Sequence, residues 1–118
     1  MYFKRNESYR FVFRQPIDGK LSKTEIGNTV TANVQIHDVS SYGAKVSCPD
    51  AMSLQEHTRI SLLFHLNSSY FHSPGTIAWV KRFHQSLELG LHLDTGDEYR
   101  ERMTSELKRI AKQERYNK

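Results

Sequence analysis

The chain has 118 residues, of which 37% are hydrophobic and 25% are charged, which is typical of one globular domain. Its single cysteine, Cys48, excludes an internal disulfide and a zinc site built from several thiolates. No stretch is apolar over the roughly 18 residues that a membrane helix needs, and the N-terminus has no signal-peptide core. We therefore expect one cytoplasmic domain without membrane insertion.

The net charge of +4 is concentrated at the two ends of the chain. Residues 1–20 carry five basic and two acidic residues (+3), and residues 97–118 carry seven and five (+2). Residues 21–96 carry five and six (−1). A basic N-terminal segment suits an anionic partner such as a phosphate, although a solvated terminus explains the charge equally well.

Short segments with alternating apolar and polar residues make up most of the chain. In residues 30–36, every second side chain is apolar, which is typical of a half-buried strand. Pro16 weakens the strand prediction for residues 11–17, because proline cannot donate a hydrogen bond to a neighbouring strand. The expected strands are 11–17, 30–36, 44–47, 60–66, 77–83 and 87–93. Six short strands joined by tight turns favour an antiparallel barrel, closed or nearly closed.

A C-terminal helix is expected from residue 95 onward. Thr95 and Glu98 have the spacing of a capping box, and an apolar side chain recurs on one helix face. That face consists of Tyr99, Met103, Leu107 and Ile110. We expect it to pack on the barrel. The single domain, 1–118, then comprises a flexible basic arm (1–10), a barrel (11–94) and a helix (95–114).

The residue types that catalysis or metal binding require are not arranged in a recognisable pattern. The six histidines are scattered, and no pair has the i, i+4 spacing of a helical zinc site. Ser40 and Ser41 follow Asp38 but lack the G-x-S-x-G sequence of a nucleophile elbow. We therefore expect no enzyme activity, no metal and no cofactor, and a protein that works by binding.

Two short motifs indicate what is bound. The segment before the first strand contains Arg5 and Arg10, and guanidinium groups bind phosphate and stack on purines. The second motif is Asp38-x-Ser40-x-x-Gly43, in which Asp and Ser favour a turn and Gly43 permits a positive φ. In that turn a carboxylate can accept from the N–H edge of guanine, and a hydroxyl can donate to phosphate. The alternative interpretations are a solvated arm and a purely structural turn.

In this order the two motifs resemble those of the PilZ domain family, and a late hairpin over residues 75–80 and 87–93 extends the resemblance to nearly the whole chain. The resemblance implies a small six-stranded split barrel with a C-terminal helix, mainly β, and cyclic di-GMP as the ligand. The ligand-binding residues carried over from the family motifs are Arg5, Arg10, Asp38, Ser40 and Gly43. Asn6 stands four residues before Arg10, where the family has its first arginine.

The leading functional hypothesis is a cyclic di-GMP receptor in which nucleotide binding orders the N-terminal arm and so signals to a protein partner. The alternative is a degenerate PilZ adaptor that binds no nucleotide and acts through protein contacts. A bacterial motility or envelope protein is the expected partner, and the chain is expected to be a monomer or a homodimer. A nucleic-acid-binding barrel is the least favoured reading, because the middle of the chain is near neutral. Trp79 is expected in the barrel core, with a stacking platform beside Phe83 as its alternative.

Overall fold

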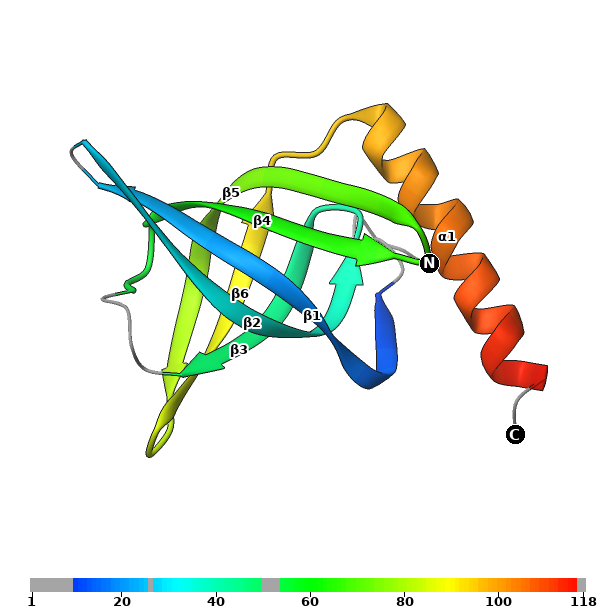
Figure 1. Cartoon of the computed structure of the whole chain (residues 1–118), viewed down its shortest axis with the longest axis horizontal. Helices are drawn as coiled ribbons and strands as arrows, with labels where there is room; N and C mark the ends of the chain where they lie inside the picture. The colour runs from blue at the N-terminus through cyan, green and yellow to red at the C-terminus, as the bar shows by residue number, and fades with distance from the viewer. Residues whose placement is uncertain (1–9, 26, 50–53, 117–118) are drawn as a thin grey trace, which may run out of the picture.

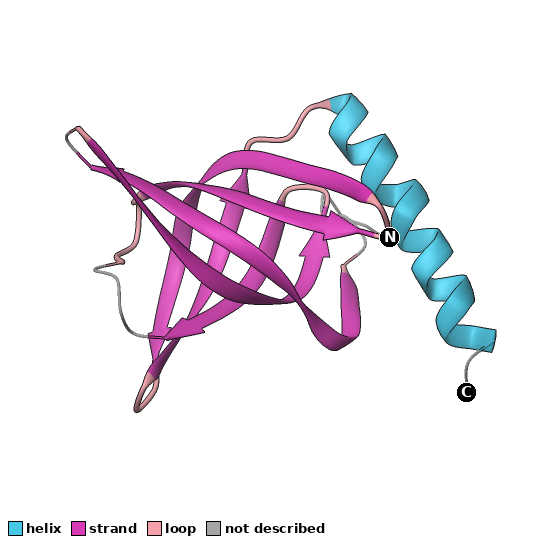
Figure 2. Cartoon of the chain, viewed as in Figure 1, coloured by secondary structure: helices cyan, strands magenta, loops and turns pink. Residues whose placement is uncertain are grey.

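The computed structural model describes residues 10–25, 27–49 and 54–116, which form six antiparallel strands closed into a barrel and one helix (Figure 1). Around the barrel the strands follow the order β1-β2-β3-β6-β5-β4, and β4 pairs back with β1. The elements are β1 Phe11–Glu25, β2 Asn28–Ser40, β3 Gly43–Pro49, β4 Arg59–Leu66, β5 Ser69–Arg82, β6 Ser86–Leu93 and α1 Asp97–Tyr116. The mainly β fold class is confirmed (Figure 2).

The apolar members of the alternating segments fill the inside of the barrel. Val34 and Ile36 of β2 are buried, as are the alternating apolar residues of β4 and β6. Those residues are Ile60, Leu62, Phe64, Leu66, Leu87, Leu89, Leu91 and Leu93. Because side chains alternate across a strand, this core leaves the intervening residues for the outer face.

The start of β1 departs from regular pairing. Its ladder with β2 passes from Val12 directly to Ile17, so Pro16 lies in the stretch without a regular partner. A residue without an N–H is tolerated there because no ladder hydrogen bond is lost. Of the expected N-terminal arm, residues 1–10, only Arg10 is among the described residues.

Helix α1 lies across one end of the barrel, at the opposite side from the tip of the β1–β2 hairpin (Figure 1). Tyr99, Met103 and Leu107 are buried in the core cluster, which confirms that the apolar face packs on the barrel. Within the described residues, no helix has the length and apolarity needed to cross a bilayer.

The predicted capping box at Thr95 is wrong. The first helical hydrogen bond runs from the Arg100 amide to the Gly96 carbonyl, and α1 begins at Asp97. The Thr95 hydroxyl instead donates to the carbonyl of Ser41 in the β2–β3 hairpin, over 2.7 Å. The Thr95 hydroxyl therefore binds a carbonyl from a distant segment and not the free amides of the first helical turn, which the local spacing predicted as its partners.

Candidate ligand-binding site

A pocket of about 550 Å³ lies where the β2–β3 hairpin meets β5 and β6. Three parts of the chain form its wall: the residue ahead of β1, the hairpin, and the neighbouring stretches of β5 and β6. The lining side chains with charge, hydrogen-bonding groups or rings are Arg10, Asp38, Ser40, Tyr42, Lys45, Trp79 and His92.

A β-bulge on β2 turns Asp38 toward this pocket. The pairing of β2 with β3 passes from Ile36 directly to Asp38, which leaves His37 as the extra residue. Ile36 is fully buried, so strict alternation would also point Asp38 into the barrel. The extra residue reverses that phase, and Asp38 lies opposite Lys45 on the outer face.

A second bulge, on β5, has the same effect on Trp79. The pairing of β5 with β6 passes from Ile77 to Trp79 and leaves Ala78 as the extra residue. Ile77 is buried, whereas Trp79 is 38% exposed and rests against Gly90: a Cβ on Gly90 would lie 2.0 Å from the indole nitrogen. The prediction that Trp79 packs in the core is therefore wrong, because the bulge turns this side chain to the outer face of the barrel.

The two bulges align the pocket residues in one row across four strands. Asp38 on β2 lies opposite Lys45 on β3. Gly90 on β6 comes next, followed by Trp79 on β5. Because neighbouring strands lie about 4.8 Å apart, this row spans roughly 14 Å. It places a carboxylate at one end, an ammonium group beside it and an indole at the other end.

Asp38 is the buried charge of the pocket. Its side chain is 7% exposed, and the Arg10 guanidinium donates a hydrogen bond to one carboxylate oxygen. The Lys45 ammonium lies 4.0 Å from the other oxygen. A buried carboxylate is stable only when such partners compensate its lost hydration. The two cations around one anion leave a net positive charge in this corner.

The β2–β3 hairpin supplies the remaining polar groups. Ser40 is buried, and its hydroxyl makes no hydrogen bond to any residue that the structure describes. Gly43, paired with Ser40, does not have the positive φ that we predicted. Glycine is required at this position because there is no room for a side chain: a Cβ on Gly43 would lie 2.7 Å from the carbonyl oxygen of Leu91. Glycine therefore allows β3 and β6 to approach each other beside the pocket.

A comparison with protein-family models matches the PilZ domain over residues 4–109. The chain belongs to the PilZ domain family. This confirms the family assigned from the two motifs. A comparison with curated proteins finds no match.

Solved PilZ structures share the fold of this chain. The PilZ domain of YcgR from Escherichia coli, solved with c-di-GMP, has a TM-score of 0.71 at 16% identity, over 98% of this chain and 100% of that one. The inhibitor of motility MotI/DgrA from Bacillus subtilis has a TM-score of 0.70 at 11% identity, over 98% of this chain and 55% of that one. YcgR in complex with c-di-GMP has a TM-score of 0.67 at 16% identity, over 92% of this chain and 48% of that one. The chain therefore spans about half the length of the last two proteins.

Four of the five residues proposed from the PilZ motifs line this one pocket. They are Arg10, Asp38, Ser40 and Gly43. The fifth, Arg5, lies outside the described residues. Tyr42, Lys45 and His92 were not predicted as site residues. The pairing of β3 with β2 and β6 brings Lys45 and His92 to the pocket wall, whereas Tyr42 lies in the loop of the second motif itself.

The side chains of this pocket can bind an anionic ligand that carries aromatic bases. It offers donors to an anion from Arg10 and Lys45, an acceptor from Asp38, and the Trp79 ring as an apolar surface. Within the described ranges, no three His, Cys, Asp or Glu side chains are grouped closely enough to hold a metal ion. PilZ domains are regulatory binding domains, and this arrangement fits that class.

Proposed function

We propose that this PilZ domain is a receptor for cyclic di-GMP and transmits the binding event to a protein partner. The observation that carries the proposal is the convergence of Arg10, Asp38 and Ser40 on one pocket, from segments that lie 28 or more residues apart in the sequence. The PilZ domain of YcgR, which shares this fold, was solved with the same nucleotide.

Each group in the pocket matches a part of the nucleotide. The Arg10 guanidinium has five N–H donors in a rigid fork, so it can hold Asp38 and still donate to a phosphate. The Lys45 ammonium adds a second positive charge near the same phosphates. Asp38 can accept from the N–H edge of a guanine, and the Ser40 hydroxyl is free to donate to the adjoining phosphate.

Trp79 adds a surface for a base. Its ring lies at the opposite end of the row from Asp38, roughly 14 Å away across the strands. A base stacked on an exposed aromatic ring contributes about 1–3 kcal/mol to binding. One guanine of the ligand would meet Asp38 while the second base or the ribose-phosphate ring approaches the indole.

The proposed output involves the segment before β1. Arg5 would join Arg10 at the phosphates, and residues 1–9 would then be held against the pocket. A partner would detect that altered surface, which is an order–disorder type of switch. A bacterial motility or envelope protein is the proposed partner, in the cytoplasm.

Calorimetric titration of the full chain with cyclic di-GMP tests the proposal. Ser40→Ala removes a hydroxyl that holds no described residue, so a loss of affinity without a loss of stability would place the ligand at the hairpin. Arg10→Gln should weaken binding by about ten- to a hundredfold, the effect of one charge-assisted hydrogen bond. Arg14→Gln is the matched control, because Arg14 is exposed on β1 and is not part of the pocket wall.

Cyclic di-AMP serves as the ligand control, since adenine has a ring-nitrogen acceptor where guanine presents a ring N–H. A folded protein that gives no heat with several hundred micromolar cyclic di-GMP would refute the receptor proposal. Asn6, at the place of the first motif arginine, favours one alternative in that case: a nucleotide-independent adaptor. That adaptor would retain a specific protein partner equally well with and without the nucleotide.

A further inference from the structure

The hairpin that carries the Asp38-x-Ser40-x-x-Gly43 motif has an unusual loop. Ser40 pairs with Gly43, so the loop consists of two residues, Ser41 and Tyr42. Neither has a positive φ. Two-residue hairpin loops normally contain a left-handed residue, because only those turns match the twist of the flanking strands. This loop therefore depends on contacts from elsewhere in the fold for its shape.

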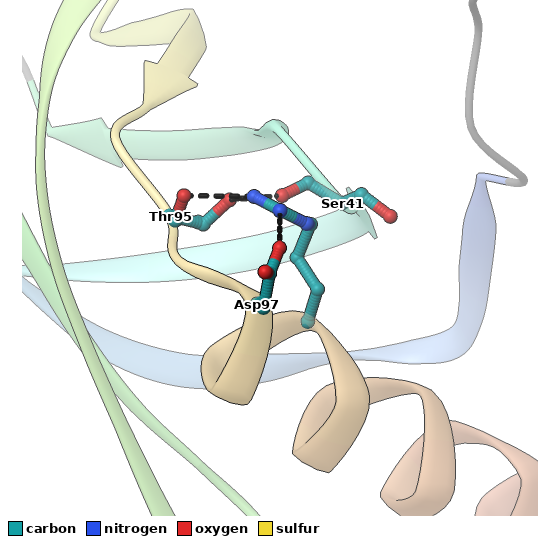
Figure 3. Close-up of polar contacts among 4 residues, drawn as sticks. Ser41, Thr95 and Asp97 are labelled. Atoms are coloured by element: carbon teal, nitrogen blue, oxygen red, sulfur yellow. Dashed lines mark hydrogen bonds and ion pairs between the residues drawn. The ribbon is translucent and has the colours of Figure 1, made fainter.

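Those contacts come from the last residue of β6 and from the segment that joins β6 to α1. The Thr95 hydroxyl donates to the Ser41 carbonyl over 2.7 Å, and the Leu93 amide donates to the Tyr42 carbonyl over 2.8 Å. Figure 3 shows Ser41, Thr95 and Asp97 facing one another where the start of the helix meets the hairpin. Both loop carbonyls are thus held from one side.

Arg100, in the first turns of α1, ties these groups together. Its Nη1 donates to the Thr95 carbonyl over 2.8 Å and to the Thr95 hydroxyl over 3.2 Å, and its Nη2 forms an ion pair with Asp97. The same guanidinium lies over the Tyr42 ring, 4.9 Å from the ring centre. Tyr42 lines the pocket, so Arg100 contacts the back of a pocket wall from the helix.

We propose that Arg100 is a positioning residue: it fixes the Ser41–Tyr42 wall of the pocket and couples that wall to the start of α1. The ligand side of this inference rests on the proposed function, whereas the anchoring exists without a ligand. Because coupling between two sites is reciprocal, occupancy of the pocket would shift the first turn of α1, and a partner bound to that turn would shift nucleotide affinity.

The chemistry of arginine is specific for this role. Its planar guanidinium donates along its edge to Thr95 and Asp97 while its face covers the Tyr42 ring. A lysine ammonium has no plane and cannot make both kinds of contact at once. Asp97 is 91% exposed, so its ion pair alone contributes little to holding the loop.

The anchoring is tested first without a ligand, by amide hydrogen exchange on the full chain. Arg100→Gln should speed exchange of the Leu93 amide about fivefold, because the Tyr42 carbonyl that protects it loses its support. Arg102→Gln is the matched control: Arg102 lies on the same helix, covers the Phe71 ring and donates to the Tyr70 carbonyl, but does not line the pocket. Equal exchange at Leu93 in all three proteins would overturn the proposal.

The coupling is tested by titration with cyclic di-GMP. Arg100→Gln should weaken binding about five- to tenfold, within the usual range of coupling between sites, whereas Arg102→Gln should not. Nucleotide-induced amide shifts at Asp97–Arg100 in the wild type should disappear in Arg100→Gln. Unchanged affinity, or shifts that persist, would overturn the coupling.

Two further cases separate a failure of this proposal from a failure to fold or to bind the nucleotide. If Arg100→Gln fails to fold, Arg100→Lys retains the charge and should reproduce the loss of affinity in a folded protein, while wild-type affinity would contradict the role of the planar group. If the wild type binds no nucleotide, the proposed function fails, and the exchange measurement at Leu93 alone decides whether Arg100 holds the loop.

Discussion

Gly90→Ala is the most direct test of the pocket wall. A Cβ on Gly90 would lie 2.0 Å, 2.2 Å and 2.6 Å from three atoms of the Trp79 indole. Real Cβ atoms do not approach other atoms that closely, so the indole must move. Because Trp79 is already 38% exposed, it can swing into solvent without opening the barrel. The substitution should therefore remove one wall of the pocket and leave the fold intact.

The expected effect on stability is similar in size to the effect on binding, so the two are measured separately. An indole that leaves β6 gives up on the order of 100 Å² of apolar contact, about 2.5 kcal/mol. Replacing glycine by alanine within a strand returns about 0.5–1 kcal/mol. The net destabilisation is then about 1.5–2 kcal/mol. The loss of one stacked base costs about 1–3 kcal/mol, which weakens cyclic di-GMP binding by about 5- to 150-fold.

Tryptophan fluorescence gives a specific readout, since Trp79 is the only tryptophan in the chain. The emission maximum of Gly90→Ala should move to longer wavelength, and cyclic di-GMP should no longer change the emission. Gly19→Ala is the matched control, because Gly19 lies on β1, outside the pocket wall. Its Cβ would lie 2.7 Å from Cδ1 of Ile36. That variant should lose stability but keep the wild-type emission and affinity. A Gly90→Ala protein with wild-type emission and affinity would refute the proposed wall.

Three further predictions concern the arginine motif, the close approach of β5 and β6 at Gly75, and the helix. Asn6→Arg places an arginine four residues before Arg10 and should tighten cyclic di-GMP binding by about ten- to a hundredfold, the effect of one charge-assisted hydrogen bond; an unchanged affinity in calorimetry would contradict the motif alignment. Gly75→Ala would place a Cβ 2.2 Å from the His92 carbonyl oxygen, which belongs to the backbone of β6. It should therefore destabilise the barrel by about 1–3 kcal/mol in urea titrations, and an unchanged midpoint would contradict the close approach of β5 and β6. Burial raises the pKa of Tyr99 to about 12, with the Arg102 guanidinium opposing that shift. Ionisation therefore favours the unfolded chain, and about 2–3 kcal/mol of stability that is present below pH 10 is lost as the pH rises from 10 to 12. Tyr99→Phe should abolish this part of the alkaline loss, and equal alkaline losses in the two proteins would contradict it. At neutral pH the variant should be more stable by about 1–3 kcal/mol, because it removes a buried hydroxyl that has no hydrogen-bond partner among the described residues.

The sequence predicted the barrel well because the alternation of apolar residues is a local property of each strand. Val34 and Ile36 are buried, as the alternation over residues 30–36 indicates. The apolar face of α1 was predicted for the same reason, since a helix repeats its pattern every three to four residues. In both cases the signal lies within one element and does not depend on what that element contacts.

Contacts between elements account for the predictions that were wrong. Trp79 was assigned to the core and Thr95 to a helix cap, yet the first lies on the outer face and the second donates to Ser41. A bulge on β5 reversed the phase at Trp79, and a carbonyl from a distant hairpin outcompeted the helix amides for Thr95. Gly43 lines the pocket, but it does not have the positive φ that we predicted. A side chain is excluded there because the Leu91 carbonyl approaches closely.

By itself the sequence determined the mainly β fold class, the apolar face of the helix and the PilZ family, because residue types and short spacings carry that information. Only the tertiary structure decided which further side chains, Lys45 and Trp79 among them, share the pocket with the motif residues. Two single-residue bulges place Asp38 and Trp79 on the outer face, and the strand register then brings Lys45 and Gly90 between them. Register and bulges are set by pairing across the whole barrel, so no single segment of the chain encodes them.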